Sequence, residues 1–254
     1  MSEIQVLEGA DGFSLEGGST GALLVHGFTG SPQGMRALGE HLNAAGLTIS
    51  APRLPGHGTT WQDLSTKTHE EWVGVVEEAF DELALVCEEV FVVGLSFGSS
   101  LCIDLAARRR GRVAGMVLLA SYVITKDPRR FLAPAVRFVV QSLPGVGNDI
   151  ADPEMREIVY ERVPTRAAYS MLQFTRRARR ALPSVTCPTL IVHARQDHTA
   201  HPDNAKIIHD ELGTTDKEIV WLDRSYHVIT VDVERDVVYD KTLAFMREHS
   251  RHGL

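Results

Sequence analysis

The chain has 254 residues, 44% hydrophobic and 23% charged, which suits one large globular domain with an insertion. A formal net charge of −7 without a long basic run argues against nucleic-acid binding. No apolar stretch approaches the ~18 residues that a membrane span needs, so we expect no stable membrane insertion. Cys87, Cys102 and Cys187 show neither a disulfide framework nor metal-ligand spacing, and the N-terminus does not resemble a secretory signal. These features predict a cytoplasmic protein.

Patterns typical of strands and helices alternate over the first 120 residues. Segment 4–15 predicts one or two edge strands with a turn at 10–12. Short apolar runs predict buried strands, and 3.6-residue periodicity predicts the helices between them. The expected elements are a strand at 21–25, a helix at 32–45 with Ser31 as its cap and Pro32 first, a strand at 47–51, a helix at 70–87, a strand at 90–94, a helix through 101–106 and a strand at 113–120. This order predicts a mostly parallel sheet with helices on both faces.

The pattern changes between residues 121 and 187. This segment predicts helices only, at 131–143, 153–163 and 165–182, separated by Pro and Gly turns. Strand and helix patterns then return, with a strand at 189–194, a helix at 202–212, a strand at 218–222 and a closing helix at 233–249. We therefore expect one α/β core, formed by 1–120 and 188–254, with a helical cap inserted over 121–187.

The segment Gly94-Leu95-Ser96-Phe97-Gly98 has the G-x-S-x-G spacing of a nucleophile elbow. It lies between an apolar strand pattern and a helical pattern, which is the context that this motif requires. A sharp turn there would hold Ser96 in a strained conformation with its hydroxyl clear of the sheet. Side chains two residues before and after would collide with the turn, so glycine suits both places. The alternative is a chance match of three positions in a chain with 21 glycines.

A serine nucleophile needs a base, and the base needs a carboxylate to orient it. In an α/β-hydrolase these residues follow strand ends in the order Ser, Asp or Glu, His. Asp197 follows the strand at 189–194, and His227 follows the strand at 218–222. Residues of the same types that compete for these roles are Asp203, Asp232, His57, His193 and His198. None of the competing histidines follows the last strand, so we expect Ser96, Asp197 and His227 to form the catalytic set.

Acyl transfer also needs N–H donors directed at the developing oxyanion. One is expected from the residue after the nucleophile, Phe97, and the other from the loop after the strand at 21–25, where we assign the backbone N–H of Phe28. The alternative for His26-Gly27-Phe28 is a plain strand-to-helix turn with Phe28 as a core contact. His57, in a glycine-rich turn, is expected to be structural.

Several short segments together resemble the bacterial carboxylesterase and monoacylglycerol lipase family of α/β-hydrolases. They are His26-Gly27-Phe28-Thr29-Gly30, Gly56-His57-Gly58, Gly94-Leu95-Ser96-Phe97-Gly98, Ala194-Arg195-Gln196-Asp197 and Ser225-Tyr226-His227-Val228. Segments 147–150 and 160–165 resemble the cap of the monoacylglycerol lipase branch. The resemblance implies an α/β-hydrolase fold and a hydrolase for monoacylglycerols or short to medium acyl esters, with no cofactor and no metal.

The resemblance also suggests which cap residues contact the substrate. By its place in the cap, Glu157 is expected to contact the glycerol part of a monoacylglycerol, with Glu154 and Glu161 on the same helix face. The alternative is a solvated glutamate. Apolar residues expected either to line an acyl pocket or to pack the cap on the core are Phe28, Phe97, Phe131, Val136, Val139 and Leu143.

Two other functions fit the same residues. One is a carbon–carbon bond hydrolase or a thioesterase that uses the same triad, and the other is a binding protein that keeps the fold without turnover. An intact Ser96, Asp197 and His227 set argues against the binding protein, because a receptor needs no base beside its serine. The sequence leaves acyl-chain length and oligomeric state open.

Overall fold

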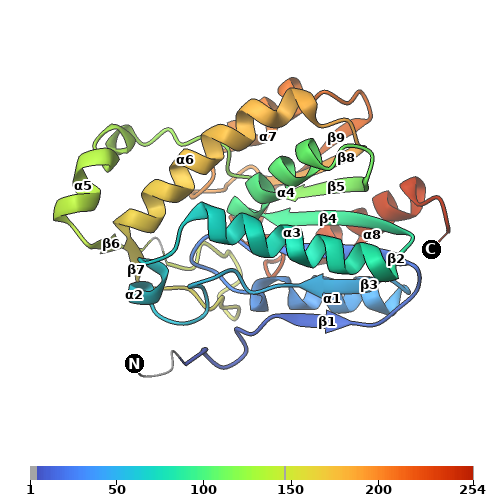
Figure 1. The fold of residues 1–254 in the computed structure, drawn as a ribbon, viewed down its shortest axis with the longest axis horizontal. Coiled ribbons are helices and arrows are strands. Elements are labelled where there is room, and N and C mark those ends of the chain that lie inside the picture. The colour runs from blue at the N-terminus through green and yellow to red at the C-terminus, as the bar shows by residue number, and fades with distance from the viewer. Residues whose placement is uncertain (1–4, 146, 254) are drawn as a thin grey trace.

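A seven-stranded sheet runs through the molecule in the computed structural model, which describes residues 5–145 and 147–253 (Figure 1). Its strands are β1 (Phe13–Leu15), β2 (Thr20–Val25), β3 (Thr48–Ala51), β4 (Glu89–Leu95), β5 (Val113–Leu119), β8 (Thr189–Ala194) and β9 (Lys217–Leu222). Their spatial order is β1-β3-β2-β4-β5-β8-β9, and within this sheet β1 alone pairs antiparallel. Strands β2, β4 and β8 are buried along their whole length, as apolar strands covered on both faces should be.

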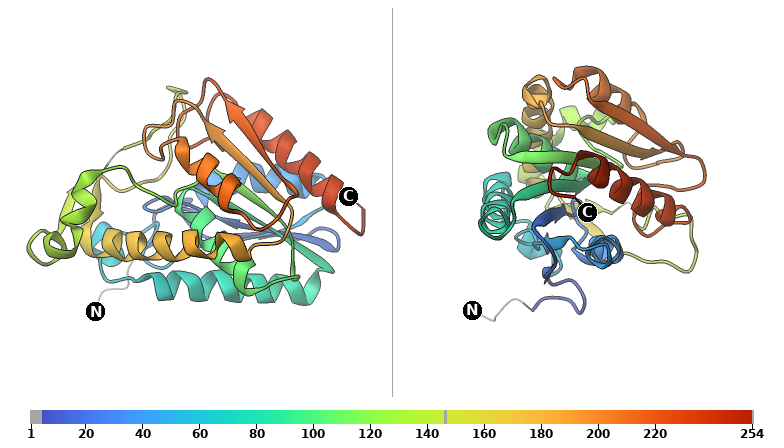
Figure 2. Two further views of the ribbon diagram at one scale, coloured as in Figure 1. Left: turned by 90° about the horizontal axis from the view of Figure 1, so that it is seen from above. Right: turned by 90° about the vertical axis from the view of Figure 1, so that its right-hand side faces the viewer.

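Helices cover both faces of the sheet, and each layer of helices packs on its own hydrophobic cluster. One face carries α3 (His69–Val86), α4 (Phe97–Arg108), α6 (Thr165–Ala181) and α7 (Asp203–Glu211), together with the short α2 (Trp61–Leu64). The other face carries α1 (Gln33–Ala44) and α8 (Arg235–His249), and Figure 2 shows the two layers with the sheet between them. The predicted fold class, an α/β-hydrolase with a mostly parallel sheet, is confirmed.

Two details near the N-terminus differ from the expectations. Segment 4–15 contributes one strand, β1, while residues 1–4 lie outside the described part of the chain. Helix α1 begins at Gln33, with Pro32 in the capping position and no side-chain cap. The expected cap by Ser31 is therefore wrong, and its buried hydroxyl has no hydrogen-bond partner among the described residues.

The segment 121–187, which connects β5 to β8 and which we call the insertion, contains strands as well as helices. It holds a 3₁₀ turn (Pro128–Phe131), α5 (Ala133–Val139), an antiparallel pair formed by β6 (Ser142–Pro144) and β7 (Arg162–Pro164), and then α6. Helix α5 and the β6–β7 pair lie at one end of the molecule, beyond the sheet (Figure 1). The expectation of helices only is therefore wrong, and the expected helix at 131–143 is shorter than predicted.

The expected helix at 153–163 is absent, and backbone N–H groups of this segment bond to side chains instead. Those of Glu157 and Ile158 donate to Asn148 and Gln33, and just before the segment the N–H of Ala151 donates to Asp232. These donors are therefore not available for the i−4 carbonyl bonds that a helix needs.

Apolar side chains at the outer end of the insertion face solvent. Phe131 is 69% exposed, Val139 81% and Leu143 46%. The alternative that these three pack the cap on the core is therefore wrong, because none of them belongs to a buried cluster. That they line an acyl pocket stays a prediction. Within the described residues, no helix combines the length and the apolar character needed to cross a bilayer.

Candidate active site

Ser96 occupies a strained turn between β4 and α4. Its φ of 54° and ψ of −118° place a residue with a side chain in a region that costs about 1–3 kcal/mol. A Cβ on Gly94 would lie 2.5 Å from the backbone of Gly98 and Ser99, and one on Gly98 would lie 2.1 Å from the carbonyl oxygen of Val25. Both glycines are therefore required by the close approach of the backbone, as the motif predicts.

The structure brings Ser96, His227 and Asp197 into one hydrogen-bonded chain. His227 Nε2 lies 2.9 Å from Ser96 Oγ, and His227 Nδ1 lies 2.8 Å from Asp197 Oδ2. Because a carboxylate only accepts, Nδ1 carries the ring proton and Nε2 is free to accept the serine proton. This arrangement can turn the Ser96 hydroxyl into a nucleophile.

Competing residues of the same types are engaged elsewhere. Asp203 pairs with Lys126, and His198 pairs with Asp149. His57 is buried against His26, with ring centroids 5.1 Å apart. Within the described residues, none of these side chains contacts Ser96.

The charges within the triad stabilise each other. Burial alone would raise the pKa of Asp197, but the charge of His227 and hydrogen bonds from His193 and His227 hold that pKa well below its usual range. Burial alone would lower the pKa of His227, but Asp197 first, with Asp149 and Glu157 after it, raises it. Asp197 therefore stays ionised, and His227 becomes a stronger base than an isolated histidine.

Two aspartates that sequence reasoning did not assign hold the loop of His227 against the insertion. The backbone carbonyl of Asp149 accepts the His227 N–H at 3.0 Å. Asp232, fully buried, accepts N–H bonds from Tyr226 at 2.7 Å and from Ala151 at 3.0 Å. In the sequence Asp232 is only a competitor of Asp197. Its position could have indicated this role, because Asp232 follows His227 closely in the chain and does not follow a predicted strand.

The two residues expected to supply the oxyanion donors are Phe97, next to Ser96 in the chain, and Phe28. A Cβ on Gly27 would lie 3.1 Å from Ser96 Cβ, so the loop that carries Phe28 packs against the nucleophile. Helix α4 begins at Phe97, so its N–H belongs to the first turn, where helices leave donors free. Within the described residues neither the Phe28 nor the Phe97 N–H has an acceptor. The two rings meet edge to face at 6.2 Å.

His26 supports the loop that carries Phe28. Its Nε2 accepts the Leu54 N–H at 3.1 Å, so the proton is on Nδ1, which donates to the Gly27 carbonyl at 2.9 Å. Burial lowers the pKa of His26 to about 4, so the ring is neutral at physiological pH. His26 therefore links this loop to the loop at Leu54.

Glu157 lies near His227, on a segment that is neither helix nor strand. The expectation that it shares a helix face with Glu154 and Glu161 is wrong. Its Oε1 would lie 2.6 Å from a Cβ on Gly30 and 2.8 Å from one on Gly34, so the carboxylate covers the start of α1. Burial raises the pKa of Glu157 to about 7, although His227 opposes the shift. The carboxylate is half-buried, close enough to the triad to interact with its charges.

Comparisons with known proteins agree with this geometry. A family model described as serine aminopeptidase, S33, matches residues 21–234. A thermostable monoacylglycerol lipase from Bacillus sp. (strain H-257) is 36% identical over 251 residues, covering 98% of this chain and 100% of its own length. A carboxylesterase from Bacillus subtilis (strain 168) is 29% identical over 239 residues, covering 93% and 96%. One solved structure, from work on LipS and LipT, "two metagenome-derived lipolytic enzymes", superposes with a TM-score of 0.94 at 36% identity, covering 96% of this chain and 100% of its own.

Proposed function

Because this chain belongs to the serine aminopeptidase S33 family, we propose that Ser96, His227 and Asp197 form the catalytic triad of a monoacylglycerol lipase. The protein is a carboxylic-ester hydrolase, and its substrates are small-molecule esters. The observation that carries the proposal is the hydrogen-bonded chain from Ser96 Oγ through His227 to Asp197.

In the proposed reaction the Ser96 oxygen attacks the ester carbonyl while His227 Nε2 takes its proton. The N–H groups of Phe28 and Phe97 stabilise the oxyanion of the tetrahedral intermediate. His227 then returns the proton to the leaving alcohol as the carbon–oxygen bond breaks. In the second half, water gives a proton to His227 and attacks the acyl-serine, which releases the acid and restores Ser96.

The first test removes the nucleophile. Ser96→Ala should lower the turnover of a p-nitrophenyl ester by roughly 10⁶-fold, because the members of a triad act as a unit. A fluorophosphonate probe should label the native enzyme and leave the variant unlabelled. If the purified variant kept more than a few per cent of the activity, the assignment of Ser96 would be wrong.

A parallel assay decides between the reaction classes that share this triad. An acyl thioester and a carbon–carbon bond substrate are compared with an acyl ester of the same chain length. We expect the ester to have the highest kcat/KM. A higher value for either competitor would replace the proposed substrate class.

The half-buried carboxylate of Glu157 supports glycerol as the alcohol part of the substrate. A monoacylglycerol carries two free hydroxyls, and a site that prefers it needs acceptors for them. Within the described residues, no N–H or O–H donates to this carboxylate. We propose that it accepts a hydrogen bond from a glycerol hydroxyl.

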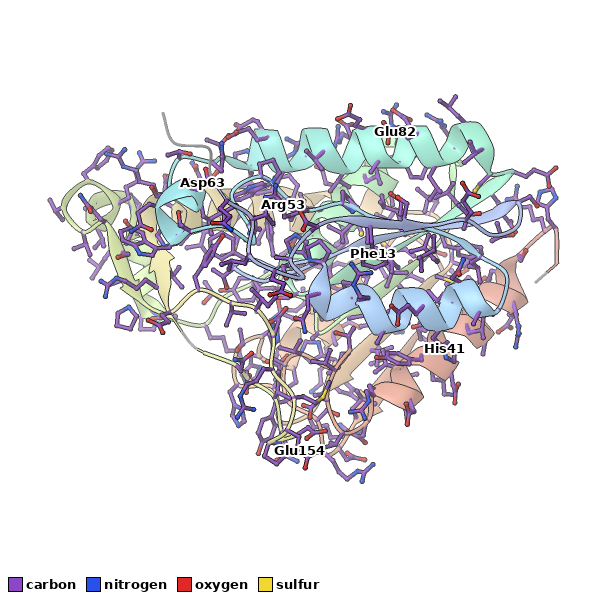
Figure 3. All side chains as sticks on the ribbon, turned by 90° about the horizontal axis from the view of Figure 1, so that it is seen from below. Phe13, His41, Arg53, Asp63, Glu82 and Glu154 are labelled. Carbon is purple, nitrogen blue, oxygen red and sulfur yellow. The ribbon has the colours of Figure 1, made fainter. Side chains whose placement is uncertain are left out.

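Replacing Glu157 tests this contact. A lost hydrogen bond to a charged group costs ~1.5–3 kcal/mol, so Glu157→Leu should lower kcat/KM for a monoacylglycerol by roughly 10- to 150-fold at pH 8. Hydrolysis of p-nitrophenyl butyrate should change little. The matched control is Glu154→Leu, because Glu154 is exposed at the outer edge of the molecule (Figure 3). Equal losses on both substrates would contradict the glycerol role.

We also propose a cytoplasmic location for the enzyme. Support comes from the cysteines, because Cys87, Cys102 and Cys187 are all free thiols. Fractionation of the source cells, with activity assayed in each fraction, tests it. Activity confined to a membrane or extracellular fraction would contradict this location.

A further inference from the structure

A second histidine contacts Asp197 on the side away from the solvent. His193, near the end of β8, is fully buried. Its Nε2 lies 2.8 Å from the carbonyl oxygen of Ala200 and 3.3 Å from Asp197 Oδ2. Both oxygens are acceptors, so Nε2 must carry the ring proton and act as the donor. The carboxylate thus lies between two imidazole rings, that of His227 and that of His193.

We propose that His193 is a positioning residue that holds the Asp197 carboxylate and limits how strongly it stabilises protonated His227. This role rests on the proposed function of the triad. His193 touches neither the serine nor the substrate site, so it acts through Asp197.

The hydrogen bonds of Asp197 show how His193 can do this. Oδ1 accepts the backbone N–H of Thr199 at 2.9 Å and that of Ala200 at 2.6 Å. Oδ2 accepts His227 Nδ1–H, and His193 Nε2–H, whose hydrogen bond goes to the Ala200 carbonyl, lies 3.3 Å from the same oxygen. The positive end of this N–H so close to Oδ2 stabilises the carboxylate charge, so the imidazolium of His227 gains less from the carboxylate. The donor also fixes the Ala200 carbonyl and closes the 197–200 turn.

Other charged groups near the rings of His227 and His193 also affect the protonation of His227. His227 faces the carboxylates of Asp197, Asp149 and Glu157, which all favour its protonated form. His193 faces Asp197 from its own loop and the Trp221 ring of β9, 6.2 Å away between centroids. The guanidinium of Arg195 lies over that same Trp221 ring. Of the N–H groups around Asp197, those of Thr199 and Ala200 bond to Oδ1, whereas that of His193 lies against Oδ2, the oxygen that binds His227.

Two substitutions of similar size separate the role of His193 as an N–H donor from a role in packing. His193→Leu keeps much of the volume and removes the donor, whereas His193→Gln keeps an N–H donor near the position of Nε2. The acid limb of the kcat/KM profile for p-nitrophenyl acetate reports protonation of His227. In His193→Leu this limb should move up by about 0.5–1 pH unit, with an unchanged KM and a plateau kcat lower by up to ~10-fold. In His193→Gln the limb should return to the native position.

An acid limb that stays in place in His193→Leu, or that moves equally in both variants, would overturn the proposal, because a packing role lowers Tm without moving the limb. Full fluorophosphonate labelling verifies that each variant is folded at Ser96. A second measurement needs no variant of His193. In ¹⁵N-histidine-labelled native enzyme, NMR should show His193 with its proton on Nε2, and the opposite tautomer would overturn the proposal. Activity retained by Ser96→Ala would instead overturn the function of the triad, and the role of His193 with it.

Discussion

Asp197 and Glu157 are both carboxylates close to His227, and their surroundings give them opposite properties. Two backbone N–H groups and two imidazoles surround Asp197, and they hold its pKa well below the usual range. Glu157 instead faces the Cα atoms of Gly30 and Gly34, and burial raises its pKa to about 7. Asp197 is therefore suited to stabilise a cation, whereas Glu157 is costly to ionise and ready to accept a ligand hydroxyl.

The raised pKa of Glu157 predicts a pH-dependent stability cost. Its folded pKa of about 7 exceeds the unfolded value of 4.5, so its contribution is fully present below pH 4.5 and is lost as pH rises through about 7. Glu157→Gln removes that loss. Relative to the native protein, the variant should gain about 1–3 kcal/mol in free energy of unfolding at pH 8 and almost nothing at pH 4.5. Urea unfolding at both pH values measures this difference, and an equal gain at each would contradict it.

At the scale of elements, the sequence correctly predicted the features that depend on neighbouring residues in the chain. Buried strands follow from apolar runs, and the turn around Ser96 follows from the steric needs of Gly94 and Gly98. The same rules placed Asp197 and His227 at the strand ends where the structure has them. They failed over residues 153–163, where the sequence has helical periodicity but the N–H of Ile158 bonds to the side chain of Gln33. Periodicity within the segment carries no information about a partner 125 residues away.

The connection between β4 and α4 predicts a strong effect of one added methyl group. In Gly98→Ala the new Cβ would collide with the backbone of Val25 in β2, which cannot move without breaking the sheet. We expect a loss of at least about 3 kcal/mol in unfolding free energy and of fluorophosphonate labelling. The control is Gly74→Ala in α3, where a Cβ meets nothing within 4 Å, and a gain of roughly 0.5–1 kcal/mol is expected. Similar stability of the two variants would refute the steric argument for the elbow.

At the scale of the whole molecule, the inserted segment shares its hydrophobic core with the sheet. Phe174 and Ala178 of α6 belong to the same buried cluster as Leu23 of β2 and Val92 of β4. Tyr160 adds a polar link, since its hydroxyl donates to the Gly56 carbonyl at 2.7 Å and accepts the Thr59 N–H at 2.8 Å. The loop that receives these bonds also contains Leu54, whose N–H binds His26 beside the oxyanion donors. Insertion and active site are therefore coupled through a short chain of contacts.

This coupling predicts that insertion and core unfold in a single transition. Tyr160→Phe leaves the buried Thr59 N–H without its acceptor and removes one of the two hydroxyl donors to the Gly56 carbonyl, the other being that of Thr59. This should cost about 1–3 kcal/mol and lower Tm by roughly 2–10 °C in a chain of this size. Far-UV circular dichroism and the rate of fluorophosphonate labelling, both followed against temperature, should shift together, because losing the 54–60 loop also releases His26 and the Phe28 donor. If labelling fell many degrees before the dichroism changed, the insertion would be undocking by itself, and residues 121–187 would be a separately folding cap.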